Sequence, residues 1–223
     1  MTTRSSISEF ALLAALLSLG TWAFAANSNA DQQLLNNAGQ VVQTMSSSNQ
    51  IPASVVSQAQ CVAVVPSLTK AGFIVGGEHG NGVVTCRTSS GWSAPAFISV
   101  SGGSFGMQAG GMQEDIVLLM NKQGQQDVMN DNFSLSANAV AAGPTGANAG
   151  ASASTWSAPI LSYKRSKNGA FAGASIQGSN ISINHGAMHK VYGQNPSAQN
   201  ILSGSVPAPS QAQTFLSDVN SLK

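Results

Sequence analysis

The sequence predicts an α+β fold: a single domain in which a strongly curved or barrel-like, mainly antiparallel β-sheet is covered by N- and C-terminal helices. The first observation is a series of short apolar and β-branched runs between Cys61 and Gly111, punctuated by glycines and almost free of charge. The second is helical periodicity before Cys61 and again after Pro207. A chain of 223 residues is long enough for one domain with a full core.

Residues 1–25 are predicted to form a cleavable secretory signal peptide. Arg4 precedes an apolar run from Phe10 to Leu19, and Ala23-Phe24-Ala25 supplies the small-x-small pattern that signal peptidase requires. The run is too short to cross a bilayer, and the alternative is an N-terminal core helix. We therefore expect an exported protein, periplasmic, envelope-associated or secreted, whose mature domain comprises residues 26–223.

Helices are expected at both ends of this domain. Apolar residues recur at helical spacing from Asp31 to Met45, and Pro52 is a favourable first position for a second short helix, so residues 31–60 are predicted to be helical. Residues 61–192 are predicted to form the β-rich core. A C-terminal helix is expected over residues 210–223, with an apolar face formed by Ala212, Phe215, Leu216, Val219 and Leu222.

The two cysteines are predicted to form a disulfide. Cys61 opens one expected strand and Cys86 closes another, and such a pair tends to be oxidised in an exported protein. The alternative is two buried thiols that pack as small apolar groups. Neither cysteine has a neighbouring His or basic cluster that would lower its pKa, so a catalytic thiol is not expected.

A series of short motifs gives this chain a resemblance to the SYLF domain family. The motifs occur in the family's order from about Asp31 to the C-terminus: Cys-Val-Ala-Val-Val-Pro at 61–66, Lys70-Ala71-Gly72-Phe73, Gly76-Gly77, Gly91-Trp92-Ser93-Ala94-Pro95, Gly103-Ser104-Phe105-Gly106, Asp115-Ile116-Val117, Ala142-Gly143-Pro144, Leu161-Ser162-Tyr163, Phe171-Ala172-Gly173 and Tyr192-Gly193.

The resemblance implies a binding domain of the secreted bacterial type. Eukaryotic SYLF proteins are described as phosphoinositide-binding and actin-associated, and they are thought to engage membranes partly through a basic N-terminal segment. Residues 31–60 of this chain contain no Lys or Arg. Actin is not an expected partner of an exported protein.

The composition restricts the possible partners. Nine Lys and Arg residues stand against eight Asp and Glu residues, so there is no basic field that would attract nucleic acid. Only 8% of residues are charged, well below the usual quarter, and the surface must be rich in Ser, Asn, Gln and Gly. Such a surface makes homo-oligomerisation or adhesion to a membrane or envelope component plausible.

The densest group of cations is the best candidate binding site. Lys164, Arg165 and Lys167 lie within four residues, and Lys70 and Arg87 would extend the patch if they share its face. We expect these cations to bind lipid or an anionic membrane surface. The alternative is that they lie in a solvated turn and have no binding role. The alternative function is a structural or adhesive envelope protein that self-associates.

No enzyme, cofactor or metal site is expected. His185 and His189 are four apart, but Asn184 and Gly186 suggest a turn and no carboxylate or thiol stands at ligand spacing. Glu114 and Asp115 would face opposite sides of a strand and could not act together as acid and base. The segment Gly76 to Gly82 is expected to be a glycine-rich connection, either a hairpin or an anion-binding nest.

Overall fold

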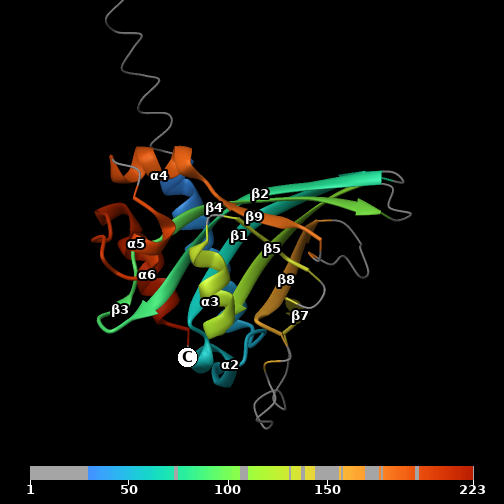
Figure 1. Ribbon diagram of the computed structural model, residues 1–223. Coiled ribbons are helices and arrows are strands. Elements are labelled where there is room, and N and C mark those ends of the chain that lie inside the picture. The colour runs from blue at the N-terminus through green and yellow to red at the C-terminus, as the bar shows by residue number, and fades with distance from the viewer. Residues whose placement is uncertain are drawn as a thin grey trace, which may run out of the picture.

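The structure of the protein is a computed structural model, shown in Figure 1. It describes residues 30–72, 75–105, 110–130, 132–136, 139–143, 156, 158–168, 176, 178–193 and 196–222. The predicted signal peptide, residues 1–25, lies outside the described residues.

A single curled sheet dominates the structure and forms a half-barrel (Figure 1). Eight strands lie in the order β6-β9-β4-β2-β1-β5-β8-β7, and β3 pairs with β2. All pairings are antiparallel except that of β7 with β8. The strand bounds are β1 Cys61–Gly72, β2 Val75–Thr88, β3 Gly91–Trp92, β4 Ala96–Phe105, β5 Gly110–Met120, β6 Asn132–Ser134, β7 Val140–Ala142, β8 Ile160–Asn168 and β9 Asn180–Ile183.

Helices occur at both ends of the described part of the chain, which confirms the predicted fold class. The described chain begins with a helix at residues 30–47, and α2 starts directly after Pro52. The remaining helices are α2 Ala53–Gln58, α3 Lys122–Met129, α4 His185–Tyr192, α5 Ala198–Leu202, the 3-10 turn η2 Ser210–Ala212 and α6 Gln213–Asn220. Within the described residues, no helix combines the length and apolar character needed to cross a membrane.

The turn expected around His185 and His189 is wrong, because both residues lie on α4. The side chain of Asn184 caps this helix by accepting a hydrogen bond from the Ala187 N–H at 3.0 Å. Gly193 ends it in the left-handed conformation, with φ of 69°. Asn and Gly therefore mark the two boundaries of a helix here.

The two faces of the sheet are covered by different helices. The helix at residues 30–47 lies behind the sheet in Figure 1, while α3 lies in front of it. Leu35, Val42 and Met45 of the first helix are fully buried, as are Phe215 and Val219 of α6. The apolar faces of the terminal helices are thus used in the core, and their burial contributes much of its stability.

The glycine-rich segment expected to be a connection lies inside β2 instead. Gly80 and Gly82 are needed there because β1 approaches closely: a Cβ at Gly82 would lie 2.5 Å from the carbonyl oxygen of Val64, and one at Gly80 would lie 2.9 Å from Leu68 Cδ1. The side chains of β1 occupy the space that these glycines leave. The nest interpretation is therefore wrong for this part of the segment.

The predicted disulfide is confirmed. Cys61 and Cys86 face each other across the β1–β2 pair, and both are fully buried. The bond ties the start of β1 to the end of β2, and it closes a loop with a sequence separation of 25 residues.

We predict that a Cys61→Ala/Cys86→Ala variant loses about 3 to 4 kcal/mol of unfolding free energy, because its unfolded chain regains the freedom of this loop. Alanine is preferred to serine because both sites are apolar. Urea unfolding of the oxidised wild type and the variant measures the difference. Equal midpoints with equal slopes would contradict the prediction.

Candidate functional site

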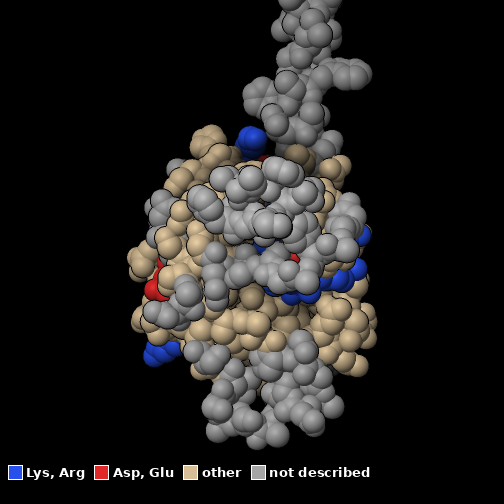
Figure 2. All heavy atoms as spheres, turned by 90° about the vertical axis from the view of Figure 1, so that its right-hand side faces the viewer, with Lys and Arg blue, Asp and Glu red and all other residues tan. Residues whose placement is uncertain are grey.

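Strand β8 carries three of the predicted cations at its far end. Register pairs place Lys164 opposite Ile116 and Arg165 opposite Asp115, so successive side chains alternate between the faces of the sheet. Strand β7 pairs only with the first part of β8, up to Ser162. In the described part of the chain, the cations therefore lie along an edge of the sheet, and Figure 2 shows Lys and Arg side chains gathered in a row on this side of the molecule.

Arg165 and Lys167 are held by the carboxylate of Asp115, whose side chain is fully buried. Arg165 Nη2 lies 2.6 Å from Asp115 Oδ2, and Lys167 Nζ lies 3.0 Å from Oδ1. The N–H of Ser67 donates a third bond to Oδ1 at 3.1 Å, and Lys167 also donates to Ser67 Oγ at 2.7 Å. Each cation side chain remains 35% exposed, so both can reach a further anion.

A bulge in β1 makes this arrangement possible. The register of β1 shifts between Val65 and Leu68 against β5, and Ser67 has φ of 62°. The bulge leaves the Ser67 N–H outside the ladder and aims it at the carboxylate of Asp115. The extra residue thus supplies a donor to a buried charge.

Lys70 does not belong to the patch. Its side chain is 5% exposed on the opposite face of the sheet, with Nζ 3.1 Å from Glu78 Oε2 and 3.3 Å from Glu114 Oε2. The hydroxyl of Ser179 donates a hydrogen bond to Glu78. The prediction that Lys70 extends the patch is therefore wrong. Side chains alternate along β1 and β5, and Lys70 lies on the same face as Glu114.

Lys164 lies near this buried cluster but is itself exposed. The pKa of Lys164 lies below its usual value, chiefly because its side chain is partly buried. The carboxylates of Glu114 and Glu78 oppose this lowering, and the positive charge of Lys70 adds to it. The ammonium group of Lys164 therefore offsets the negative charge that one lysine and two glutamates leave in excess.

Arg87 lies near the C-terminal end of β2 and is also separate from the cations of β8. Its Nε donates to the carbonyl oxygen of Ala59 at 2.8 Å, and its Nη2 donates to that of Val56 at 3.2 Å. These carbonyls belong to the end of α2, where a cation is favourable. The guanidinium also stacks 4.4 Å from the ring centre of Trp92. Arg87 thus has a structural role.

The prediction that Glu114 and Asp115 face opposite sides is confirmed, but sequence reasoning missed that both are buried. A signal for this was present. Two acids stand directly before the apolar run Ile116–Met120 within one strand. Acidic residues in that position need cationic partners on neighbouring strands.

The described residues contain no group of three or more potential metal ligands. His185 and His189 are exposed on α4.

Residues 101–222, more than half of the chain, match the protein family described as Las17-binding protein actin regulator, or Ysc84. The chain belongs to the Ysc84/SYLF family. The described curved sheet with its flanking helices is therefore the structure of a SYLF domain.

Eukaryotic relatives share this SYLF domain. The chain is 37% identical over 71% of its length to LAS seventeen-binding protein 3 of Saccharomyces cerevisiae, and the match covers 36% of that protein. It is 36% identical over 77% of its length to SH3 domain-containing YSC84-like protein 1 of Rattus norvegicus, where the match covers 51%. The chain thus spans about a third to a half of the relatives that it matches.

We predict that Arg165→Gln/Lys167→Gln destabilises the domain by about 3 kcal/mol, because it leaves the buried Asp115 carboxylate without a cationic partner. Adding Asp115→Asn should restore more than half of that loss, since a neutral amide needs no counter-charge. Urea unfolding of the two variants gives the comparison. If the triple variant were the less stable of the two, the cations would not be serving Asp115.

Proposed function

We propose that this SYLF domain is a non-enzymatic module that binds anionic membrane surfaces through the edge of β8. The observation that carries the proposal is that three cations lie along one edge of β8, Arg165 and Lys167 on one face of the sheet and Lys164 on the other. Counting Lys70 and its partners, four cations stand against three carboxylates in this region. The edge therefore keeps a modest net positive charge.

Asp115 prepares two of these cations for binding. It holds Arg165 and Lys167 in fixed positions while about a third of each side chain stays exposed, so little side-chain freedom remains to be lost when a phosphate approaches. Each cation near an anionic membrane surface contributes about 1 kcal/mol. The resulting binding should be weak and sensitive to salt.

The mode of binding that we propose is electrostatic and peripheral. The apolar faces of the helix at residues 30–47 and of α6 are used in the core, as the full burial of Leu35, Met45 and Phe215 illustrates. Insertion of a terminal helix would expose that core. Contact through charged side chains leaves the fold intact.

We further propose that the protein is exported. The predicted signal peptide of residues 1–25 would direct it to the periplasm, the envelope or the medium. The buried disulfide between Cys61 and Cys86 supports this, because such bonds persist in oxidising compartments.

A protein partner is the alternative, and the names of the relatives refer to Las17 binding and SH3 domains. One kind of protein partner is a second copy of this chain, and the charges on β8 affect that possibility. Lysines on a strand edge oppose pairing with a second copy of the same edge. Self-association would therefore have to use another surface.

The test is sedimentation of the protein with vesicles of phosphatidylcholine, alone or mixed with phosphatidylglycerol, at low and high salt. We expect pelleting only with the anionic vesicles and its loss at high salt. Lys164→Gln and Asp115→Asn/Arg165→Gln/Lys167→Gln each remove one net positive charge, and each should lower the partition coefficient by about 5-fold.

Lys190→Gln is the matched control, because Lys190 is exposed on α4 and its loss changes the net charge equally. An equal loss of binding in this variant would show that overall charge, and not the β8 edge, governs binding. Absence of pelleting under every condition would overturn the proposal in favour of a protein partner.

A further inference from the structure

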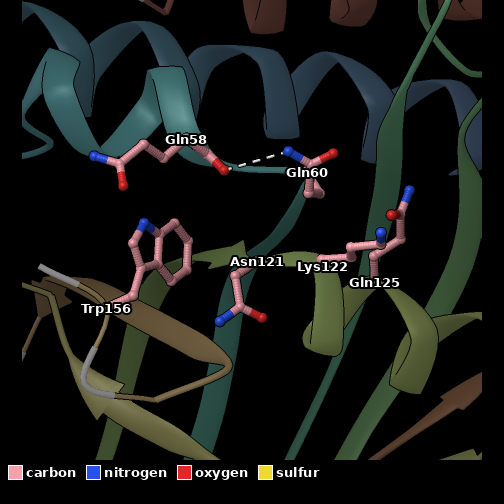
Figure 3. A pocket seen from close by; sticks show the side chains of 6 residues that line it. All are labelled: Gln58, Gln60, Asn121, Lys122, Gln125 and Trp156. Atoms are coloured by element: carbon pink, nitrogen blue, oxygen red, sulfur yellow. Dashed lines mark hydrogen bonds between the residues drawn. The ribbon is translucent and has the colours of Figure 1, made fainter. Parts of the chain in front are cut away.

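A cavity of about 450 Å³ lies at the opposite end of the sheet from the cations of β8. Figure 3 shows its lining, which comes from three separate parts of the chain: Gln58, Gln60, Asn121, Lys122, Gln125 and Trp156. Its volume falls within the range of roughly 300–1,000 Å³ that is typical of small-molecule sites. The proposed membrane contact uses none of these residues.

Backbone contacts fix the frame of this cavity. The N–H of Gln60 donates to the carbonyl oxygen of Met120 at 2.7 Å, and that of Asn121 donates to Pro159 at 3.0 Å. Gly124 lets α3 pack directly on Pro159, because a Cβ there would lie 2.8 Å from the Pro159 oxygen. The side chains of Asn121, Lys122 and Gln125 therefore project from a helix start that is fixed against the sheet.

Trp156 supplies an aromatic surface and an unused donor. In Figure 3 its indole points toward the space below Gln58. Its Nε1 is buried and has no hydrogen-bond partner among the described residues. A buried donor without a partner is unfavourable, and an acceptor oxygen on a ligand would satisfy it.

The carboxamides around Trp156 present both acceptors and donors. Gln58 and Gln60 use their Nε2 groups on the backbone oxygens of Ser54 and Gln58, at 2.9 and 3.4 Å, which leaves their amide oxygens to accept. Asn121 Oδ1 accepts from the first turn of α3, which leaves its amide N–H groups to donate. No side-chain hydrogen bond of Gln125 or Lys122 to a described residue occurs.

We propose that this cavity, the amide pocket, binds a sugar ring of a saccharide. A pyranose has an apolar C–H face that can pack on an indole, and its hydroxyl or acetamido groups both donate and accept, as the carboxamides do. The single cation, Lys122, can take a ring hydroxyl or a carboxylate. A nucleobase could also stack on Trp156, but the nearly neutral chain offers little attraction for its phosphates.

The test follows the indole N–H signals of the full chain by NMR during separate titrations with cellotetraose, maltotetraose, tetra-N-acetylchitotetraose and, as a competing class of ligand, adenosine monophosphate. The chain has three tryptophans, and Trp→Phe variants assign their signals. We expect at least one saccharide to shift the Trp156 signal in a saturable manner. Trp92 stacks on Arg87, whose N–H donates to the carbonyl oxygen of Gln60, so its signal is a second reporter of the pocket lining and not a control.

Variants test the roles of individual groups. Gln125→Ala should raise the dissociation constant about 5-fold through the loss of one hydrogen bond. Trp156→Phe should raise it by a similar factor, because the aromatic ring is kept and the indole N–H is lost. Lys164→Gln should leave it unchanged, and thermal unfolding followed by circular dichroism verifies that each variant is folded. No shift with any of the three saccharides, or a shift of Trp156 only with adenosine monophosphate, would overturn the proposal.

Discussion

The buried carboxylate of Asp115 is the interaction on which the edge of the sheet depends. A charge with no solvent exposure persists only when it is paired and hydrogen-bonded, and this one has two cations and a backbone N–H. The bulge at Ser67 and the positions of Arg165 and Lys167 all follow from that requirement. Three neighbouring strands, β1, β5 and β8, are thereby tied together at a point where the ladder is irregular.

The adjacent Glu114 repeats this logic on the other face, where it shares Lys70 with Glu78. A chain with only 8% charged residues thus uses several of its charges inside the sheet. Its exposed polar groups must then be mostly amides and hydroxyls. The few cations left at the β8 edge and the carboxamides around Trp156 are both consequences of this distribution.

Sequence patterns predicted a β-rich region, the terminal helices and the disulfide, because these depend on local periodicity and on the pairing of two cysteines. They did not predict α3 and α4, whose apolar faces are short and whose beginnings are marked by Asn121 and Asn184, residues that also favour turns. The positions of Lys70 and Arg87 required the strand register, which the bulge in β1 changes. The amide pocket joins residues almost a hundred positions apart, which no local pattern indicates.

Strand β8 connects the two proposed sites, yet it should keep them energetically separate. Eight register pairs join it to β5, so a ligand at one end cannot shift the strand without breaking a ladder. From Ile160 to Arg165 the strand rises about 17 Å, and effects at such separations usually add. A membrane held at the cations would therefore leave the amide pocket open at the other end. With both proposed sites occupied, the domain would link a saccharide to an anionic surface.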